Sequence, residues 1–149
     1  MNRTDHRSRY KNLTAFLLLL FSFLNCGNSQ SIMTISPQEV KTKLDNKEKI
    51  IIIDVRSIEE FDGELGHIPG AILRPIPDIT TWSDEFSEQK EQEIVMVCRS
   101  GNRSSRATSF LQEQGFSNVK NMSGGMLEWN KLEFPIEKNN SSEDDDGQK

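Results

Sequence analysis

The amino-acid sequence predicts an α/β fold, in which a parallel sheet is covered by helices on both faces. Two apolar runs, 49–55 and 93–97, have the length and composition of buried strands. Segments with helix-start signals or helical spacing alternate with such runs along the chain. Alternation of this kind is typical of a parallel sheet, because each helix returns the chain to the edge where the next strand begins. The 149 residues suit one such domain.

The N-terminal residues predict export of the chain. Four basic residues within 1–12 precede an almost unbroken apolar run over 13–24. That run is shorter than the roughly 20 residues of a membrane span, so a signal peptide over 1–25 is expected. The run ends at Phe23-Leu24-Asn25-Cys26-Gly27, which resembles a bacterial lipobox, although that pattern favours Leu three residues before the cysteine and a small residue directly before it. We therefore expect lipidation of Cys26, with ordinary cleavage nearby as the alternative.

These features define an expected organisation for the whole chain. The lipid would be its only link to a membrane, and the protein would face the periplasm, or be soluble there if Cys26 carries no lipid. The C-terminal residues hold Asp144-Asp145-Asp146 and no apolar side chain, which predicts a disordered acidic tail. The predicted parts are a signal peptide at 1–25, the lipidated cysteine and a linker at 26–33, a folded domain at 34–137, and the tail at 138–149.

The first half of the folded domain holds two predicted helix starts around a strand. Ser36 can cap a helix whose first position is Pro37, and Glu39 completes a capping box. The run 49–55, with four consecutive isoleucines, predicts a strand that is buried on both faces. A second capped helix is expected over 57–61, because Glu60 lies three residues after a serine.

The second half continues the alternation. Glycines and prolines predict a loop over 63–77, with a short strand at 71–74. Trp82 and Phe86 are four residues apart, and both tryptophans of the chain, at 82 and 129, are expected in the core. Gly115 is expected to end the helix that follows the cysteine loop. The predicted elements are an amphipathic helix at 78–90, a strand at 93–97, a helix at 106–113, a strand at 118–121, and a final helix from 124 that ends before Pro135.

Composition excludes several classes of function. The net charge of −5 gives no footprint for nucleic-acid binding. With only two cysteines, Cys26 and Cys98, no disulfide framework can form. The two histidines, His6 and His67, are too few to join the cysteines in a metal cluster of usual spacing, so no metal is expected.

Cys98 stands where a predicted strand ends and a helix begins. In open α/β sheets, ligands bind at the carboxyl ends of the strands. The helix start offers unpaired N–H groups and a positive dipole end, and Arg99, Arg103 and Arg106 add positive charge. These features favour a thiolate, so we predict a lowered pKa and a nucleophilic Cys98. The alternative is a small buried core residue, but no apolar residue separates Cys98 from Arg106.

Several stretches, in the same order, resemble the rhodanese, or sulfurtransferase, domain. The resemblance covers roughly residues 34–137. It implies a doubly wound α/β domain with about five parallel strands, in which backbone N–H groups of the cysteine loop cradle the sulfur. The stretches are Ile53-Asp54-Val55-Arg56 with Glu59-Glu60-Phe61, Gly66-His67-Ile68-Pro69-Gly70-Ala71, Cys98 to Ser104, Gly115-Phe116, and Gly124-Gly125-Met126 with Trp129.

The resemblance also assigns roles to residues. It implies that Cys98 is the catalytic residue and that His67 belongs to the scaffold rather than to the chemistry. Asp54 and Arg56 follow a predicted strand and are expected to support the loop as an ion pair, the alternative being two solvated charges. Gly124 and Gly125 permit close backbone approach and are expected to form the wall opposite the loop. The expected substrate-binding residues are Arg99, Ser100, Gly101, Asn102, Arg103 and Ser104.

The function so implied is a two-step sulfur transfer. Cys98 would take sulfur from a small anionic donor such as thiosulfate, and the resulting persulfide would pass it to a thiol or to cyanide, with no metal or organic cofactor required. A sulfur carrier that feeds a partner protein and a non-catalytic binding module are alternatives, although the presence of Cys98 argues against the latter. Cysteine phosphatases have an arginine six residues after the cysteine, whereas Arg103 comes five after Cys98 and Ser104 takes the sixth place.

Overall fold

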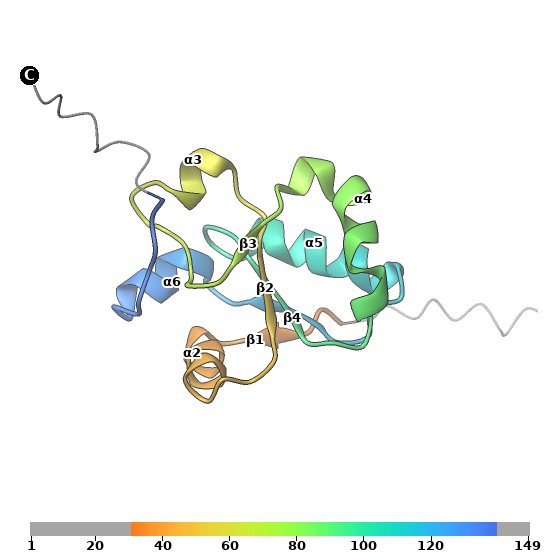
Figure 1. Ribbon diagram of the computed structural model, residues 1–149, viewed down its shortest axis with the longest axis horizontal. Coiled ribbons are helices and arrows are strands. Elements are labelled where there is room, and N and C mark those ends of the chain that lie inside the picture. Colours follow the sequence, from red (N-terminus) through yellow and green to blue (C-terminus); the bar gives the residue numbers. More distant parts are fainter. Residues whose placement is uncertain (1–30, 140–149) are drawn as a thin grey trace, which may run out of the picture. The chain divides into compact units, whose positions relative to one another are not determined.

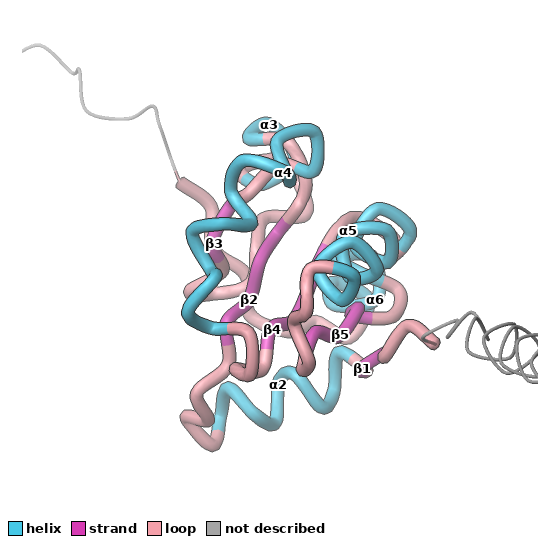
Figure 2. The backbone as a smooth tube through the Cα atoms, turned by 90° about the vertical axis from the view of Figure 1, so that its right-hand side faces the viewer, coloured by secondary structure: helices cyan, strands magenta, loops and turns pink. Residues whose placement is uncertain are grey.

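Five parallel strands form one sheet in the described part of the chain, residues 31–139 of a computed structural model. Their order in the sheet is β1-β5-β4-β2-β3, and Figure 2 shows them side by side in that order. The predicted α/β class and the parallel sheet are confirmed. The strands are β1 (Thr34–Ile35), β2 (Ile51–Asp54), β3 (Ile72–Leu73), β4 (Ile94–Val97) and β5 (Val119–Met122).

Helices cover both faces of this sheet. Figure 1 shows α2 and α6 on one side of the strands and α4 and α5 on the other, with α3 near one end. None of the helices within residues 31–139 combines the length and apolar content needed to cross a membrane. The α-helices are α2 (Pro37–Asp45), α3 (Ile58–Phe61), α4 (Ile79–Trp82), α5 (Asn102–Glu113) and α6 (Gly125–Lys131), and the 3-10 helices are η1 (Ile76–Asp78) and η2 (Ser83–Gln89).

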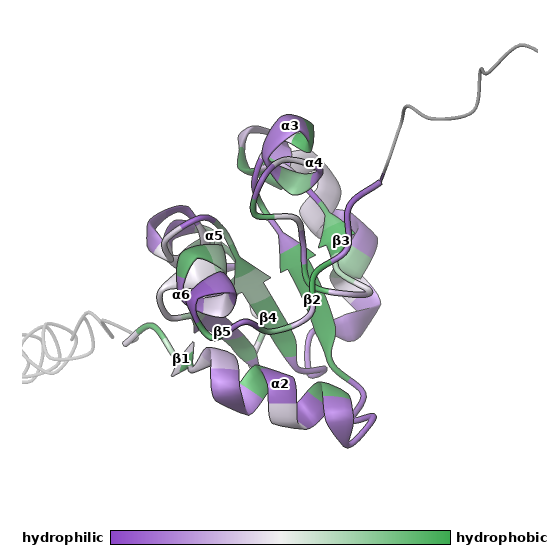
Figure 3. Cartoon of the chain, turned by 90° about the vertical axis from the view of Figure 1, so that its left-hand side faces the viewer, coloured by the Kyte–Doolittle hydropathy of each residue, from purple (hydrophilic) through white to green (hydrophobic). Residues whose placement is uncertain are grey.

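Two apolar clusters sandwich the sheet because successive side chains of a strand point to opposite faces. On one face, Ile53 and Met96 pack with Trp82 and with Leu111 of α5. On the other face, alternate residues of the same strands pack with α2 and α6, and that cluster contains Ile52, Val95, Val40, Met126 and Trp129. Figure 3 shows β2 and β4 largely hydrophobic, between helices that combine hydrophilic and hydrophobic residues. Both tryptophans are in the core, as predicted.

The helix starts differ in how their caps are completed. Ser36 and Glu39 form the predicted capping box of α2 in both directions. Ser57 caps α3 by accepting a hydrogen bond from the Glu60 N–H group at 3.3 Å. The Glu60 carboxylate does not return to the cap, however, because it binds Arg103 instead.

Three elements differ from the sequence prediction. The segment 78–90 is α-helical only over four residues and continues as η2, although Trp82 and Phe86 are buried as its spacing indicated. Helix α5 begins at Asn102, four residues earlier than predicted, so Arg103 and Ser104 lie in its first turn rather than in the loop. Strand β1 was not predicted at all, because two residues carry no periodicity and their pairing with β5 is a tertiary contact.

The predictions for the two ends of the chain mainly concern residues outside 31–139. The predicted signal peptide, Cys26 and most of the linker lie before residue 31, and nearly all of the acidic tail lies after residue 139.

Candidate functional site

Cys98 directly follows the central strand β4 and is only 1% exposed. Three residues connect it to α5, and the last of them, Gly101, has a φ of 95° and serves as the helix N-cap. Arg99, Ser100 and Asn102 of the predicted binding set are exposed around the loop, whereas Gly101 and Ser104 are buried. The loop therefore presents a polar rim above a buried thiol.

The start of α6 packs directly against the cysteine loop, where Gly124 and Gly125 were expected to form a wall. Met126 donates its N–H to the carbonyl of Cys98 at 2.9 Å, and Leu127 donates to Arg99 at 3.0 Å. Gly125 has a φ of 57°, and a Cβ atom there would stand 2.3 Å from the Cys98 carbonyl oxygen. Only glycine allows this close approach, so the β5–α6 turn fixes the backbone that carries the thiol.

Hydrogen-bond donors surround the sulfur. Gly101 donates its N–H to Cys98 Sγ at 3.1 Å, and Ser104 Oγ lies 3.3 Å from the same atom. Burial raises the pKa of the thiol, but hydrogen bonds from the Ser104 hydroxyl and from the N–H groups of Ser104, Ser100 and Gly101 outweigh it. The pKa of Cys98 therefore lies below its ordinary value, which is the direction predicted.

Arg103 is paired with Glu60, a contact that the sequence did not predict. Its two terminal nitrogens donate to the two carboxylate oxygens of Glu60, each at 2.6 Å. The Arg103 guanidinium lowers the pKa of Glu60, chiefly through these hydrogen bonds. The pair links the first turn of α5 to α3, and the other two arginines, Arg99 and Arg106, remain exposed.

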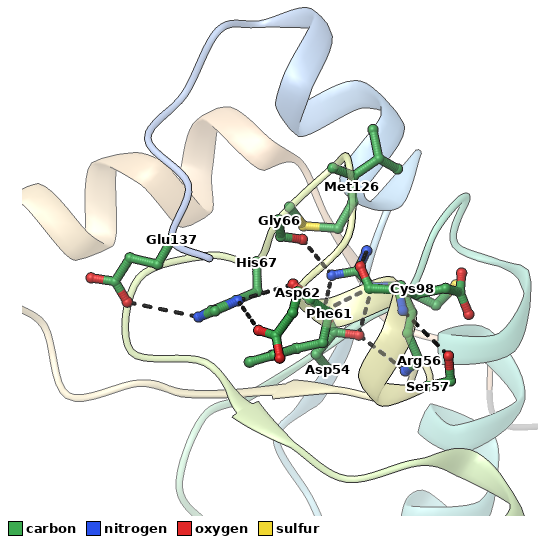
Figure 4. A network of polar contacts seen from close by, with 12 residues as sticks. Asp54, Arg56, Ser57, Phe61, Asp62, Gly66, His67, Cys98, Met126 and Glu137 are labelled. Carbon is green, nitrogen blue, oxygen red and sulfur yellow. Dashed lines mark hydrogen bonds and ion pairs between the residues drawn. The ribbon is translucent and has the colours of Figure 1, made fainter. Parts of the chain in front are cut away.

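Asp54 and Arg56 form the expected ion pair beneath the site, with Arg56 Nη2 2.6 Å from Asp54 Oδ2. Both side chains are fully buried, at 0% and 1% exposure. Arg56 also donates to the carbonyls of Glu60 at 2.9 Å and of Gly66 at 2.6 Å (Figure 4). The pair therefore joins the end of β2 to α3 and to the glycine-rich loop.

His67 lies in the scaffold, as the resemblance implied. Its backbone N–H and carbonyl pair with Glu137, and its ring stacks on Phe61 with the ring centroids 3.6 Å apart. Nδ1 lies 3.1 Å from the Phe61 carbonyl, and the carboxylates of Asp62 and Glu137 stand 3.9 and 3.8 Å from the two ring nitrogens (Figure 4). These contacts anchor the end of the domain and do not involve Cys98.

A cavity of about 200 Å³ opens beside the cysteine loop. Arg56 and Arg99 contribute positive charge to its walls, and Glu59, Glu60 and Glu64 contribute negative charge from α3 and the residues after it. Its walls therefore carry more negative than positive charge. Within residues 31–139, no group of three His, Cys, Asp or Glu side chains is placed to hold a metal ion.

Two residues of the site were not identified from the sequence. Glu60 was interpreted as a capping residue and as part of a stretch that resembles the family, but nothing local indicated its partner in α5. Asn121 of β5 lies with its Oδ1 atom 2.6 Å from Ser104 Oγ, which makes it a neighbour of the thiol's own donor. A polar residue at the end of a predicted strand, just before a glycine pair, was the available signal.

Comparison with known proteins supports one family. The family model described as "Rhodanese-like domain" matches residues 36–132. The chain is 39% identical over 102 residues to "Putative sulfur carrier protein YrkF" of Bacillus subtilis, and the match spans 68% of this chain and 53% of that protein. It therefore spans about half the length of that relative.

Two further relatives are matched over nearly their whole length. A protein of Allochromatium vinosum named "Sulfurtransferase" is 31% identical over 102 residues, which are 68% of this chain and 92% of the relative. The crystal structure of a rhodanese-like domain protein from Staphylococcus aureus matches with a TM-score of 0.62 and 31% sequence identity. The match covers 72% of this chain and 100% of the Staphylococcus aureus chain.

Proposed function

Because this chain belongs to the rhodanese-like domain family, we propose that it is a sulfurtransferase that carries sulfur as a persulfide on Cys98. The observation that supports this most directly is the buried thiol at the end of β4, with the Gly101 N–H at 3.1 Å and Ser104 Oγ at 3.3 Å from its sulfur. Donors in these positions stabilise a sulfur anion before any substrate arrives.

In the first step, the Cys98 thiolate attacks the outer sulfur of an anionic donor such as thiosulfate. A Cys98 S–S bond forms, the sulfur–sulfur bond of thiosulfate breaks, and sulfite leaves with the bonding electron pair. Arg99, Ser100 and Asn102 are exposed at the rim and are the side chains available to meet the donor.

In the second step, a thiol or cyanide attacks the outer sulfur of the persulfide. The S–S bond breaks, its electron pair returns to Cys98 as the thiolate, and the acceptor leaves with the sulfur. The same backbone N–H groups serve both steps, because each step begins or ends with an anion in the loop. All of these bond changes take place at sulfur, so the two reaction steps require no metal or organic cofactor.

A sulfur carrier of the same chemistry is the second candidate, because the Bacillus subtilis relative bears the name of a sulfur carrier. In that case Cys98 would hold sulfur for a partner protein. A phosphatase has less support, because Arg103 comes one residue early and is bound to Glu60 on both of its terminal nitrogens.

The test is intact-mass spectrometry of the protein after incubation with thiosulfate. One added sulfur, ~32 Da, is expected as the covalent intermediate of nucleophilic catalysis, and cyanide should remove it as thiocyanate. Cys98→Ser should show neither event, because a serine hydroxyl is not ionised near neutral pH. Ser105→Ala is the matched control on the same helix and should behave as the native protein.

The outcomes separate the candidates. Repeated thiocyanate formation from thiosulfate and cyanide indicates an enzyme, whereas a persulfide that forms without such turnover indicates a carrier. Cys98-dependent phosphate release from an aryl phosphate, without any persulfide, would replace the proposal by a phosphatase.

We also propose that residues 34–137 act as an exported domain that a lipid on Cys26 tethers to a bacterial membrane, facing the periplasm. The basic segment, the apolar run over 13–24 and the sequence around Cys26 support this. Labelling of cells with a palmitate analogue should mark the native protein and not Cys26→Ala. Equal labelling of the two would contradict lipidation, and a soluble periplasmic form would indicate ordinary cleavage.

A further inference from the structure

Three acceptors compete for the one hydroxyl proton of Ser104. Its Oγ lies 3.3 Å from Cys98 Sγ, 3.2 Å from the Gly101 carbonyl and 2.6 Å from Asn121 Oδ1. Ser104 is fully buried, and Asn121 is 7% exposed. A hydroxyl donates one hydrogen bond at a time, and Asn121 offers the shortest contact. While Oδ1 accepts that proton, the sulfur receives no hydrogen bond from this side chain.

Rotation of the Asn121 amide can change which acceptor receives the Ser104 hydroxyl proton. A half-turn about the last side-chain bond exchanges Oδ1 and Nδ2 and leaves the rest of the residue in place. Nδ2 then donates to Ser104 Oγ, and the hydroxyl proton becomes available to Cys98 Sγ. Within residues 31–139, Nδ2 makes no hydrogen bond in the present orientation, so the turn breaks none on that side.

The surrounding backbone restricts the movement to the amide. Asn121 lies in β5 between two neighbours, with Met96 of β4 and Thr34 of β1 as its register partners. Its N–H also donates to the Met33 carbonyl at 2.8 Å. The strand therefore holds the side chain beside Ser104. When the sulfur is an anion, a hydrogen bond to it is charge-assisted and stronger than one to an amide oxygen, which favours the reversed orientation.

We propose that Asn121 is a positioning residue that directs the Ser104 proton. When Cys98 ionises, the amide turns, donates its N–H to Ser104 Oγ, and leaves the hydroxyl proton to the thiolate. When Cys98 is neutral, Oδ1 accepts the proton across the 2.6 Å contact, the shortest of the three. The use of this relay in sulfur transfer rests on the proposed function, but the relay itself acts on thiol ionisation, which can be measured without any sulfur donor.

The charged groups near the thiol belong to other elements and stay unchanged in the variants below. The Asp54–Arg56 pair comes from the end of β2, Glu60 comes from α3, and Arg99 and Arg103 come from the loop and α5. From β5 and α6 the neighbouring groups, Asn121 and Met126, carry no charge.

The test is a double-mutant cycle in the full chain carrying Cys26→Ser, which leaves Cys98 as its only thiol. Thiolate absorbance near 240 nm is followed against pH. The carboxylate of Asn121→Asp, when ionised, accepts hydrogen bonds in either orientation and donates none, so it holds the Ser104 proton and adds a charge. We expect the thiol ionisation constant to fall about tenfold or more. In a Ser104→Ala background, where only the charge acts, we expect a fall of about threefold.

Equal falls in the two backgrounds would overturn the proposal, since Asn121 would then act through charge alone. Asn121→Ala removes both Oδ1, which competes for the Ser104 proton, and Nδ2, which would donate to Ser104 Oγ. The ionisation constant of the Cys98 thiol in this variant should therefore stay within about threefold of the native value. A larger fall with alanine than with aspartate would also overturn it. Near-UV circular dichroism checks that each variant folds. If the aspartate variant does not fold, a change of more than about threefold in the ionisation constant of Asn121→Ala would overturn the proposal. A positive cycle without persulfide formation would reject the sulfurtransferase and keep the relay.

Discussion

At Cys98, hydrogen bonds outweigh burial and lower the pKa of the thiol. The thiol is 1% exposed, and burial by itself opposes ionisation. The N–H groups of Ser100 and Gly101 and the hydroxyl of Ser104 more than offset that effect. Arg103, in contrast, has its terminal nitrogens engaged by Glu60.

The rate of Cys98 alkylation should report this environment. The lowered folded-state pKa predicts an inflection below about 8.5, the ordinary value for a thiol. The thiolate therefore contributes stability that is complete above the ordinary pKa and is lost as pH falls through the folded one. Ser104→Ala should move the inflection upward, and Ser105→Ala should leave it in place. An inflection at or above 8.5 in the native protein would contradict this account.

Between elements, the Glu60–Arg103 pair joins α3 to the first turn of α5. Both contacts measure 2.6 Å, and both side chains remain partly exposed, at 30% and 37%. The two residues are 43 positions apart in the chain, so the pair fixes how α3 sits against the cysteine loop. It also neutralises the Arg103 guanidinium, which belongs to the predicted substrate-binding set.

Removal of this pair should strengthen binding of an anionic donor. Glu60→Gln loses the carboxylate and frees the guanidinium, and a charge-assisted hydrogen bond of this kind corresponds to roughly tenfold in affinity. The KM for thiosulfate should therefore fall while kcat changes little. Glu59→Gln, an exposed neighbour on the same helix, makes the same change in net charge and is the control. Equal KM values for the two variants would show that only net charge matters.

For the whole molecule, the buried Asp54–Arg56 pair is important because it connects several segments of the chain. Arg56 contacts the end of β2, the Glu60 carbonyl and the Gly66 carbonyl, so three segments depend on one guanidinium. Both partners are excluded from water. A charge left alone in such a place costs far more than an exposed one.

Arg56→Met should destabilise the fold by about 3–5 kcal/mol, because it leaves the Asp54 carboxylate buried without its partner. Arg74→Met is the matched control, since Arg74 pairs with Glu85 at the same 2.6 Å distance on an exposed surface. That loss should be about 0–1 kcal/mol. Urea denaturation monitored by tryptophan fluorescence measures both. Similar losses would show that burial of the pair adds nothing to the free energy of unfolding.

The sequence by itself determined the features that neighbouring residues decide. The consecutive isoleucines of β2 and the apolar run of β4 indicated buried strands, and the Ser36–Glu39 box located the start of α2. The position of Cys98 between a strand and a helix predicted the direction of its pKa shift. These predictions were accurate because hydrophobic periodicity and capping operate within a few residues.

Only the tertiary structure decided which distant groups meet. Strand β1 exists because β5 pairs with it, and Glu60 binds Arg103 rather than its own cap because α3 and α5 converge above the sheet. Asn121 reaches Ser104 from 17 positions away because α5, which carries Ser104, packs against β5. The physical reason is that a side chain takes the partner that the packed fold brings within hydrogen-bond distance, and sequence spacing does not encode that distance.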